Sequence, residues 1–182
     1  MAFGGRNGYV ADPHNEGRHV RLGLTTVVLL TLLAQAGLAR ALTLKGLGTT
    51  YAQDISPAEF AALPHTTITV MIHGTARVFD GVPMLELLRR VKAPWGDTLT
   101  GKDLSDVVLV TCQDGYQVAF SLGEIDPGTA KGQVLIADRA DGAPLDAHSG
   151  PFQVVVEDDA RPARDARMVA RIELIRLAPP AK

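Results

Sequence analysis

The sequence predicts an α+β fold, with mixed β-sheets and a few short helices. Six short segments have the alternating or continuous apolar pattern of β-strands, and turn signals separate most of them. The helical patterns are brief, and none follows a strand in the repeated strand–helix–strand order of a doubly wound sheet. About 140 residues remain after a possible leader, which is enough for one domain with its own core.

Three short helices are expected, each with a start signal. Residues 56–59 read Ser-Pro-Ala-Glu, a capping box with proline at the first helical position, so a helix should run from there to about Leu63. A second helix should begin at Val82-Pro83, and a brief helical turn at 121–124. The second helix has one apolar face, formed by Leu85, Leu88 and Val91.

The strand patterns begin at 67–72, where β-branched and apolar residues alternate. His73-Gly74 ends this run, and 76–79 is expected to continue it after a bend. Later strands are predicted at 134–137, 152–156 and 170–177.

The segment 106–120 places the only cysteine of the chain at the end of a strand. Residues 107–111 form a nearly continuous aliphatic run, typical of a central strand buried on both faces. Asp114-Gly115 marks a tight turn, so 116–120 should pair back on that run as a hairpin. Three roles are open to Cys112 at the mouth of this hairpin: a small packed residue, a metal ligand or a reactive thiol.

The same patterns predict the core. Val108 and Val110 should face one side of the sheet and Leu109 the other, because side chains alternate along a strand. The residues expected to be buried are Val108, Leu109, Val110, Val118, Phe120, Leu135, Val154, Val155, Ile172 and Leu174.

Composition excludes several functions. The formal net charge of -2 leaves no basic surplus, so we expect no nucleic-acid partner. A single cysteine cannot form an internal disulfide. No spacing typical of zinc or haem ligands occurs, and Ser121 and Ser149 lack a nucleophile elbow. His73 and His148 each lie close to turn glycines, which favours a turn or surface role for both.

The N-terminal region differs from the rest of the chain. Residues 22–39 are uncharged, follow Arg18 and Arg21, and lead into the small-x-small pattern Ala39-Arg40-Ala41. We therefore predict that residues 1–41 are a signal peptide with a polar N-terminal extension, and that residues 42–182 form a single periplasmic or secreted domain. The alternative is a retained membrane anchor, since 18 residues is near the lower limit for spanning. No Arg-Arg pair precedes the apolar run, so the twin-arginine signature is absent and export of an unfolded chain is indicated.

Four segments follow one another in a recognisable order: GTARVFDGVPMLELLRRV, VVLVTCQDGYQVAFSLGEID, VLIADRADGAPLDAHSGPFQVVVEDD and ARDARMVARIEL. The most specific piece is 141–145, Asp-Gly-Ala-Pro-Leu, with 148–151, His-Ser-Gly-Pro, and the strand at Val154 after it. In this order the chain resembles the oxidoreductase molybdopterin-binding domain, the cofactor domain of the sulfite oxidase family, in a small standalone form. The resemblance covers roughly Ile68 to Leu177 and implies that fold.

The resemblance also implies a site. Cys112 would supply a thiolate to molybdenum, for which sulfur ligands are suited. Arginines would hold the pterin phosphate and an oxyanion substrate, because a guanidinium fork matches such oxygen pairs. The candidates lie in one segment: Arg161, Arg164, Arg167 and Arg171.

This sequence departs from the family pattern at the places where the cofactor would lie. Residues 113–116, Gln-Asp-Gly-Tyr, form a hairpin turn in place of a small loop that bears glycine and asparagine. Residues 157–159 are three carboxylates, Glu-Asp-Asp, in place of Pro-Gly, and Arg167-Met168 stands in place of Lys-Trp. The arginines are interleaved with Asp158, Asp159 and Asp165, which favours a solvated charged face.

Two functions remain open. The sequence favours a noncatalytic, cofactor-free module that binds a small anionic ligand or an unknown partner protein, with a membrane contact only if the leader is retained. The alternative is a molybdopterin-dependent oxidoreductase, or its cofactor subunit, with Cys112 as the molybdenum ligand. Export favours the module, because molybdopterin is inserted inside the cell and its exported carriers normally leave folded by the twin-arginine route.

Overall fold

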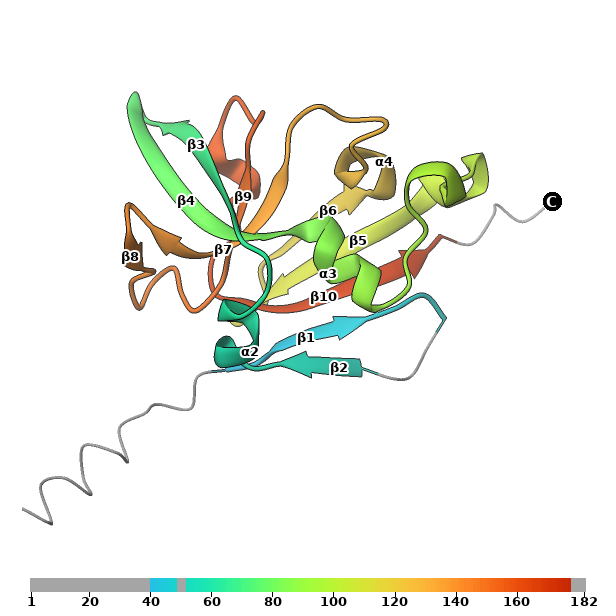
Figure 1. Ribbon diagram of the computed structural model, residues 1–182, viewed down its shortest axis with the longest axis horizontal. Coiled ribbons are helices and arrows are strands. Elements are labelled where there is room, and N and C mark those ends of the chain that lie inside the picture. The colour runs from blue at the N-terminus through green and yellow to red at the C-terminus, as the bar shows by residue number, and fades with distance from the viewer. Residues whose placement is uncertain (1–39, 49–51, 178–182) are drawn as a thin grey trace, which may run out of the picture. The chain divides into compact units, whose positions relative to one another are not determined.

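The fold consists of two β-sheets, and each sheet combines strands from separated parts of the chain (Figure 1). The computed structural model describes residues 40–48 and 52–177. In the first sheet the order is β2-β1-β10-β5-β6, and in the second it is β3-β4-β7, with β8 and β9 also paired to β7. The strands are β1 (Leu42–Lys45), β2 (Ala52–Ile55), β3 (Thr66–Ile72), β4 (Thr75–Pro83), β5 (Asp106–Cys112), β6 (Gln117–Ser121), β7 (Val134–Ala140), β8 (Ala143–Pro144), β9 (Gln153–Val156) and β10 (Val169–Arg176). The α-helices are α2 (Pro57–Ala61), α3 (Met84–Arg90) and α4 (Leu122–Ile125), and short 3-10 helices lie at Gly96–Thr98, Gly101–Ser105 and Pro162–Arg164.

The first sheet contains the predicted hairpin. β5 pairs antiparallel with β6 and, on its other side, with β10. β10 in turn pairs parallel with β1, which forms an antiparallel pair with β2. The hairpin prediction is therefore confirmed, while β1 and β2 are strands that the sequence patterns did not predict.

The second sheet begins with a hairpin that the sequence did not predict. Residues 75–83 do not continue β3 after a bend; they reverse direction and pair antiparallel with it as β4. The cause is the turn at His73 and Gly74, where both residues have left-handed φ values of 51° and 81°. Two successive left-handed residues give the tight turn that suits a two-residue hairpin.

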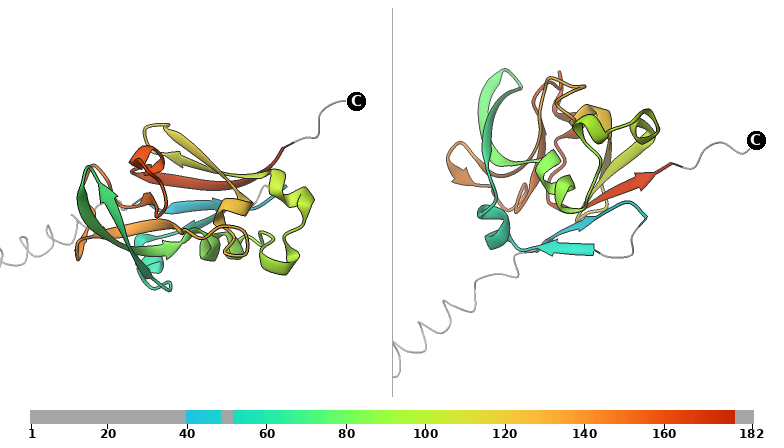
Figure 2. Two further views of the ribbon diagram at one scale, coloured as in Figure 1. Left: turned by 90° about the horizontal axis from the view of Figure 1, so that it is seen from above. Right: turned by 45° about the vertical axis from the view of Figure 1, so that its right-hand side comes forward.

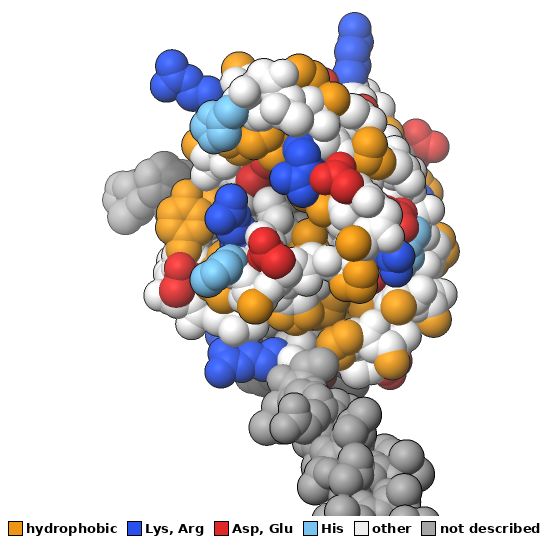
Figure 3. Space-filling model, turned by 90° about the vertical axis from the view of Figure 1, so that its left-hand side faces the viewer, with side chains coloured by type: hydrophobic (Ala, Val, Ile, Leu, Met, Phe, Trp, Pro, Cys, Tyr) orange, Lys and Arg blue, Asp and Glu red, His pale blue; other side chains and the backbone are white. Residues whose placement is uncertain are grey.

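All described residues belong to one compact unit, 39–182. On the face shown in Figure 3, acidic, basic and histidine side chains are interspersed with apolar ones. Within residues 40–48 and 52–177, no helix is long and apolar enough to cross a membrane. The predicted leader segment, 22–39, lies outside the described residues.

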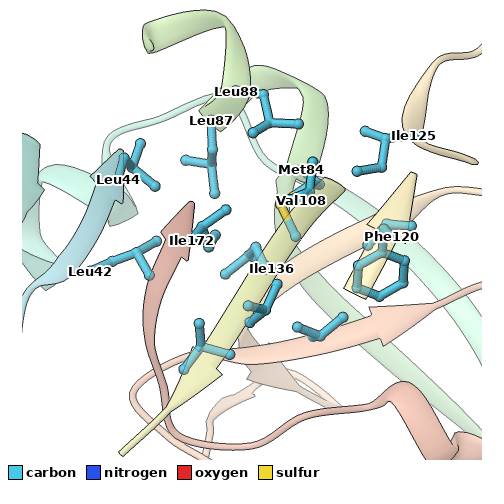
Figure 4. Close-up of a cluster of buried hydrophobic side chains, with 14 of the residues drawn as sticks. Leu42, Leu44, Met84, Leu87, Leu88, Val108, Phe120, Ile125, Ile136 and Ile172 are labelled. Carbon is cyan, nitrogen blue, oxygen red and sulfur yellow. The ribbon is translucent and has the colours of Figure 1, made fainter. Parts of the chain in front are cut away.

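The main core lies between the two sheets (Figure 2). Leu42, Leu44 and Ile172 enter it from the first sheet, Ile136 enters from the second, and α3 contributes three residues (Figure 4). Those three are Met84, Leu87 and Leu88. A smaller cluster covers the opposite face of the second sheet and consists of Ile68, Val70, Phe79, Leu135, Ala137 and Val155. The second sheet is therefore buried on both faces at β7, where Leu135 and Ile136 point to different clusters.

Nine of the ten residues predicted to be buried are buried, and Leu109 is the exception. β5 alternates between buried and half-buried residues, so only the face that carries Val108 and Val110 enters the core. The prediction of a central strand buried on both faces is therefore wrong. β10 occupies the middle of the sheet, and β5 lies next to the edge strand β6.

The helix start signals are confirmed, with small shifts. Ser56 and Glu59 form the predicted capping box of α2, and Ser121 and Glu124 form another at α4. In α3 the buried face is rotated from the predicted one, because the apolar residues Met84, Leu87 and Leu88, at i, i+3 and i+4, are the ones that face the core. Leu85 and Val91 are consequently half-buried and pack at the margin of the core.

Candidate functional site

Cys112 ends β5 with its side chain on the core face of the strand. It follows the buried Val108 and Val110 on that face, belongs to the main core cluster and is 4% exposed. Its backbone closes the hairpin: the N–H donates to the carbonyl of Tyr116 at 2.9 Å, and the carbonyl accepts from the N–H of Gly115 at 3.1 Å. The thiol is therefore a packed group at the mouth of the hairpin.

The surroundings keep this thiol protonated. Burial, and to a lesser extent the nearby carboxylate of Asp114, raise the pKa of Cys112 to about 11. Thiolates, not thiols, bind metals and act as nucleophiles. At neutral pH the group therefore behaves as a small apolar side chain.

The turn after Cys112 is held in place by hydrogen bonds. The carboxylate of Asp114 accepts from the N–H of Tyr116 at 2.9 Å, and Gly115 has a left-handed φ of 88°. The N–H of Gln113 donates to the carbonyl of Met168 at 2.9 Å. These bonds fix the turn against the segment before β10, so the backbone here is already paired within the chain.

Arg164 is held between two carboxylates. Its Nε and Nη2 donate to both oxygens of Asp159 at 2.9 and 2.6 Å, and its Nη1 donates to Glu124 Oε1 at 2.8 Å. The guanidinium also lies 4.8 Å from the ring centre of Phe120. The hydrogen bonds that Arg164 donates to the two carboxylates raise its pKa above the usual value. Each nitrogen of this guanidinium therefore already donates a hydrogen bond within the protein.

The other candidate arginines lie in different places. Arg161 is exposed, and Arg171 lies on the outer face of the first sheet, 3.7 Å from the carboxylate of Glu173. Arg167 lines a pocket that contains neither Cys112 nor Arg164. Arg171 also lines a pocket of about 430 Å³ together with Cys112 and Gln113. Of the four predicted arginines, the structure thus places Arg171 beside Cys112 and the other three elsewhere.

The pocket lined by Arg167 has a volume of about 370 Å³. It lies between the β3–β4 turn, the beginning of β9 and the segment that carries Pro162 to Arg167, and Tyr116 reaches it from the β5–β6 turn. Gln153 and Asp165 also line it. Sequence reasoning treated Asp165 only as a counter-charge and missed Gln153. The available signal was a polar residue placed inside the apolar run 152–156.

Asp165 is the most perturbed carboxyl group of this pocket. Its pKa is raised to about 6, mainly by burial and also by the negative charge of Asp159. The N–H of Val156, 3.3 Å from Oδ1, and the guanidinium of Arg167 act in the opposite direction. A carboxyl group of this kind changes its charge under mildly acidic conditions.

The histidines singled out from the sequence lie at turns. His73 has a left-handed φ at the β3–β4 turn and lines the pocket, while the N–H of His148 donates to Asp146 Oδ1 at 3.0 Å. Among the residues that the structure describes, no group of three or more His, Cys, Asp or Glu side chains is arranged to hold a metal ion.

Comparisons with known proteins give one informative result. No family model matches the chain, and no curated protein matches it. Among solved structures, the fold is similar to that of the sulfane dehydrogenase SoxCD from Paracoccus pantotrophus, with a TM-score of 0.58 and 15% sequence identity. The match covers 76% of this chain and 39% of that chain. The α+β fold predicted from the sequence, of the sulfite-oxidase type, is thereby confirmed, and in fold the chain is similar to somewhat more than a third of a sulfane dehydrogenase chain.

Proposed function

We propose that this chain is an exported, noncatalytic binding domain that keeps the scaffold of a molybdopterin-binding domain without using the cofactor. The observation that carries the proposal is the orientation of Cys112, whose thiol is packed on the core face of β5. A molybdenum ligand has to be a thiolate that points into an open site. Burial and Asp114 both disfavour that thiolate by raising the pKa of Cys112.

The charges around Arg164 also argue against a fit to the cofactor. Molybdopterin carries a phosphate, and an oxo-metal centre adds further negative charge, so a cofactor site needs free cations. Arg164 is bound to Asp159 and Glu124, while Glu157 and Asp158 are exposed beside them. A cofactor phosphate would have to displace these carboxylates from Arg164. We therefore conclude that the residues present do not fit the group in this arrangement.

The predicted leader supports the same proposal. An uncharged segment that ends in Ala39-Arg40-Ala41, without paired arginines, is typical of export in the unfolded state. A chain that folds only after export has no opportunity to receive molybdopterin inside the cell. A domain of this kind would act by binding, with a small ligand or a partner protein as the bound species.

The second candidate is a molybdopterin-dependent oxidoreductase, or its cofactor subunit, with Cys112 as the molybdenum ligand. The likeness of the fold to a sulfane dehydrogenase favours it. Fold alone does not fix function, however, because one scaffold can serve unrelated activities. This candidate requires a rearrangement that turns Cys112 out of the core.

Metal and pterin analysis of the protein from its native exported fraction tests the proposal. Molybdenum is measured by mass spectrometry and pterin by fluorescence after oxidation, and the Cys112→Ser variant serves as the matched control. We expect neither molybdenum nor pterin in stoichiometric amounts in either protein. Stoichiometric molybdenum that is lost in Cys112→Ser would reject the proposal and establish the oxidoreductase.

A further inference from the structure

The 370 Å³ pocket is lined by several polar and charged side chains. Gln153, Asp165 and Arg167 line it, together with His73 and Tyr116. Pockets of roughly this volume and above hold small ligands in other proteins. The chemistry of the pocket therefore depends on which of these groups are free to bind.

Gln153 is 5% exposed and lines the pocket. Among the described residues its amide has no hydrogen-bond partner, and it is not one of the side-chain atoms sealed from solvent without a partner, so it faces the open space of the pocket. A carboxamide has two N–H donors and a carbonyl acceptor, and a buried polar group normally has these paired. Because Gln153 lines the pocket, a bound molecule can supply the missing partners.

Asp165 and Arg167 supply opposite charges to the same pocket. They are separated in the chain by the buried Ala166. Within the described residues, the carboxylate of Asp165 has no ion-pair partner, and the guanidinium of Arg167 has none either. Arg164, three residues earlier, contrasts with them because Asp159 and Glu124 bind it from two sides.

A ligand with one kind of charge would match only half of this arrangement. A simple anion would be attracted by Arg167 and repelled by Asp165, and a simple cation would meet the reverse. A molecule that carries both charges satisfies both side chains, and its charged groups can also pair with the amide of Gln153. We infer that this pocket binds a small zwitterion of the α-amino acid type, with its ammonium group at Asp165 and its carboxylate at Arg167. The inference rests on the proposed function, since it requires a domain that binds a ligand in place of the cofactor.

The first experiment is a thermal-shift survey with each of the twenty common α-amino acids, tested singly against the molybdenum-free protein. We expect at least one to raise the melting temperature in a concentration-dependent way, because a ligand that binds only the folded state stabilises it. Titration calorimetry then compares that amino acid with its two half-ligands, the carboxylic acid without the amino group and the amine without the carboxyl group. Each half-ligand should bind at least tenfold more weakly.

Two variants test the assigned contacts. Asp165→Asn and Arg167→Gln should each weaken binding of the amino acid at least tenfold, because each removes one charge of the pair. Arg161→Gln is the matched control, an exposed arginine of the same segment that does not line the pocket, and should bind as the wild type does. A carboxylic acid that binds as tightly as the amino acid, in both the wild type and Asp165→Asn, would show a simple anion site and overturn the inference.

The two proposals fail separately. If none of the twenty amino acids stabilises a molybdenum-free protein, the zwitterion site is rejected while the cofactor-free domain stands. If the native protein contains stoichiometric molybdenum held by Cys112, the cofactor-free domain is rejected, and the ligand inference that depends on it is rejected with it.

Discussion

Gly81 lies against the backbone of Ile136 with no space for a side chain. A β-carbon on Gly81 would lie 2.5 Å from the Cα of Ala137 and closer still to the carbonyl oxygen of Ile136. This approach occurs where the pairing of β4 with β7 shifts register, between Asp80 and Gly81. Because the obstructing atoms belong to the backbone of an interior strand, they cannot move aside as a flexible side chain would.

The first prediction follows from this contact. Gly81→Ala should lower the free energy of unfolding by about 3 kcal/mol, because the added methyl group forces β4 and β7 apart. Gly101→Ala is the control, since a β-carbon there meets no atom within 4 Å. Urea denaturation of both variants measures the difference. Equal stability of the two would show that β4 can shift without cost.

The second prediction concerns the reactivity of Cys112. In the folded protein at pH 8, the thiol should react with a disulfide reagent at least roughly a hundredfold more slowly than in the urea-unfolded chain, because burial raises its pKa to about 11 and blocks access. Absorbance of the released thiolate reports the rate. Rapid labelling of the folded protein would instead show that the thiol can turn out of the core.

Asp165 gives the third prediction, a pH-dependent change in stability. Its pKa is about 6 in the folded protein and about 4 in an unfolded chain, so the ionised form destabilises the fold above pH 6, and this cost disappears as the pH falls to 4. Asp165→Asn should therefore be more stable than the wild type at pH 7.5, by about 1 kcal/mol after allowance for partial exposure of the group. The difference should vanish near pH 4.

Chemical denaturation at the two pH values measures this effect. Loss of stability in Asp165→Asn at pH 7.5 would contradict it and would make the carboxylate a structural group. The expected result also serves as a control for the binding test. If Asp165→Asn is more stable than the wild type and binds the amino acid more weakly, unfolding cannot be the cause of the weaker binding.

The fourth prediction tests the bridge formed by Arg164. Arg164→Gln should lower the free energy of unfolding by about 1–2 kcal/mol, because it leaves Asp159 and Glu124 as neighbouring unpaired carboxylates. Arg164→Lys should recover only part of the loss, since an ammonium cannot make the two-pronged contact with Asp159. Arg161→Gln, in the same segment, should leave stability unchanged. A loss that persists unchanged in 1 M salt would point to packing against Phe120 as the cause.

The fifth prediction concerns processing. The mature protein in the exported fraction should begin at Leu42, because Ala39-Arg40-Ala41 is a small-x-small pattern at the end of an uncharged segment. The intact mass of the purified protein checks this directly. Replacement of Ala39 by the bulky Leu should block cleavage. A native mass that retains residues 22–39 would favour the membrane anchor instead.

Much of the fold could be predicted because its signals are local. The capping boxes at Ser56 and Ser121, the turn at Asp114-Gly115 and the alternation along β6 and β10 each depend on a few neighbouring residues. β1 and β2 were missed because each has only four residues, too few for a reliable period, and their pairing depends on β10 at the other end of the chain. The reversal at His73 was missed because histidine seldom takes the left-handed conformation that it has there.

The site was less predictable than the fold. The sequence showed that Cys112 lies at the end of a strand. Which face of the sheet its side chain points to became clear only from the register of β5 with β10. The arginines were adjacent in the sequence, yet Arg164 and Arg167 lie at different pockets. Gln153 and Asp165 line the same pocket because the loop after β9 folds back against that strand. The N–H of Val154 donates to the carbonyl of Ala166 at 2.8 Å and holds the two segments together. No sequence period encodes that contact.

The parallel pairing of β1 with β10 determines the order in which this domain can assemble. Leu44 stands opposite Ile172, so β1 can pair early with β2 but gains its parallel neighbour only when β10, more than a hundred residues later, is present. Until then the apolar side chains of Leu42 and Leu44 have no sheet to cover them, and the emerging chain stays open. Closing so long a loop is slow compared with forming a hairpin. The topology thus delays completion of the first sheet until Val169–Arg176 have joined the chain, which suits the proposed export of an unfolded chain.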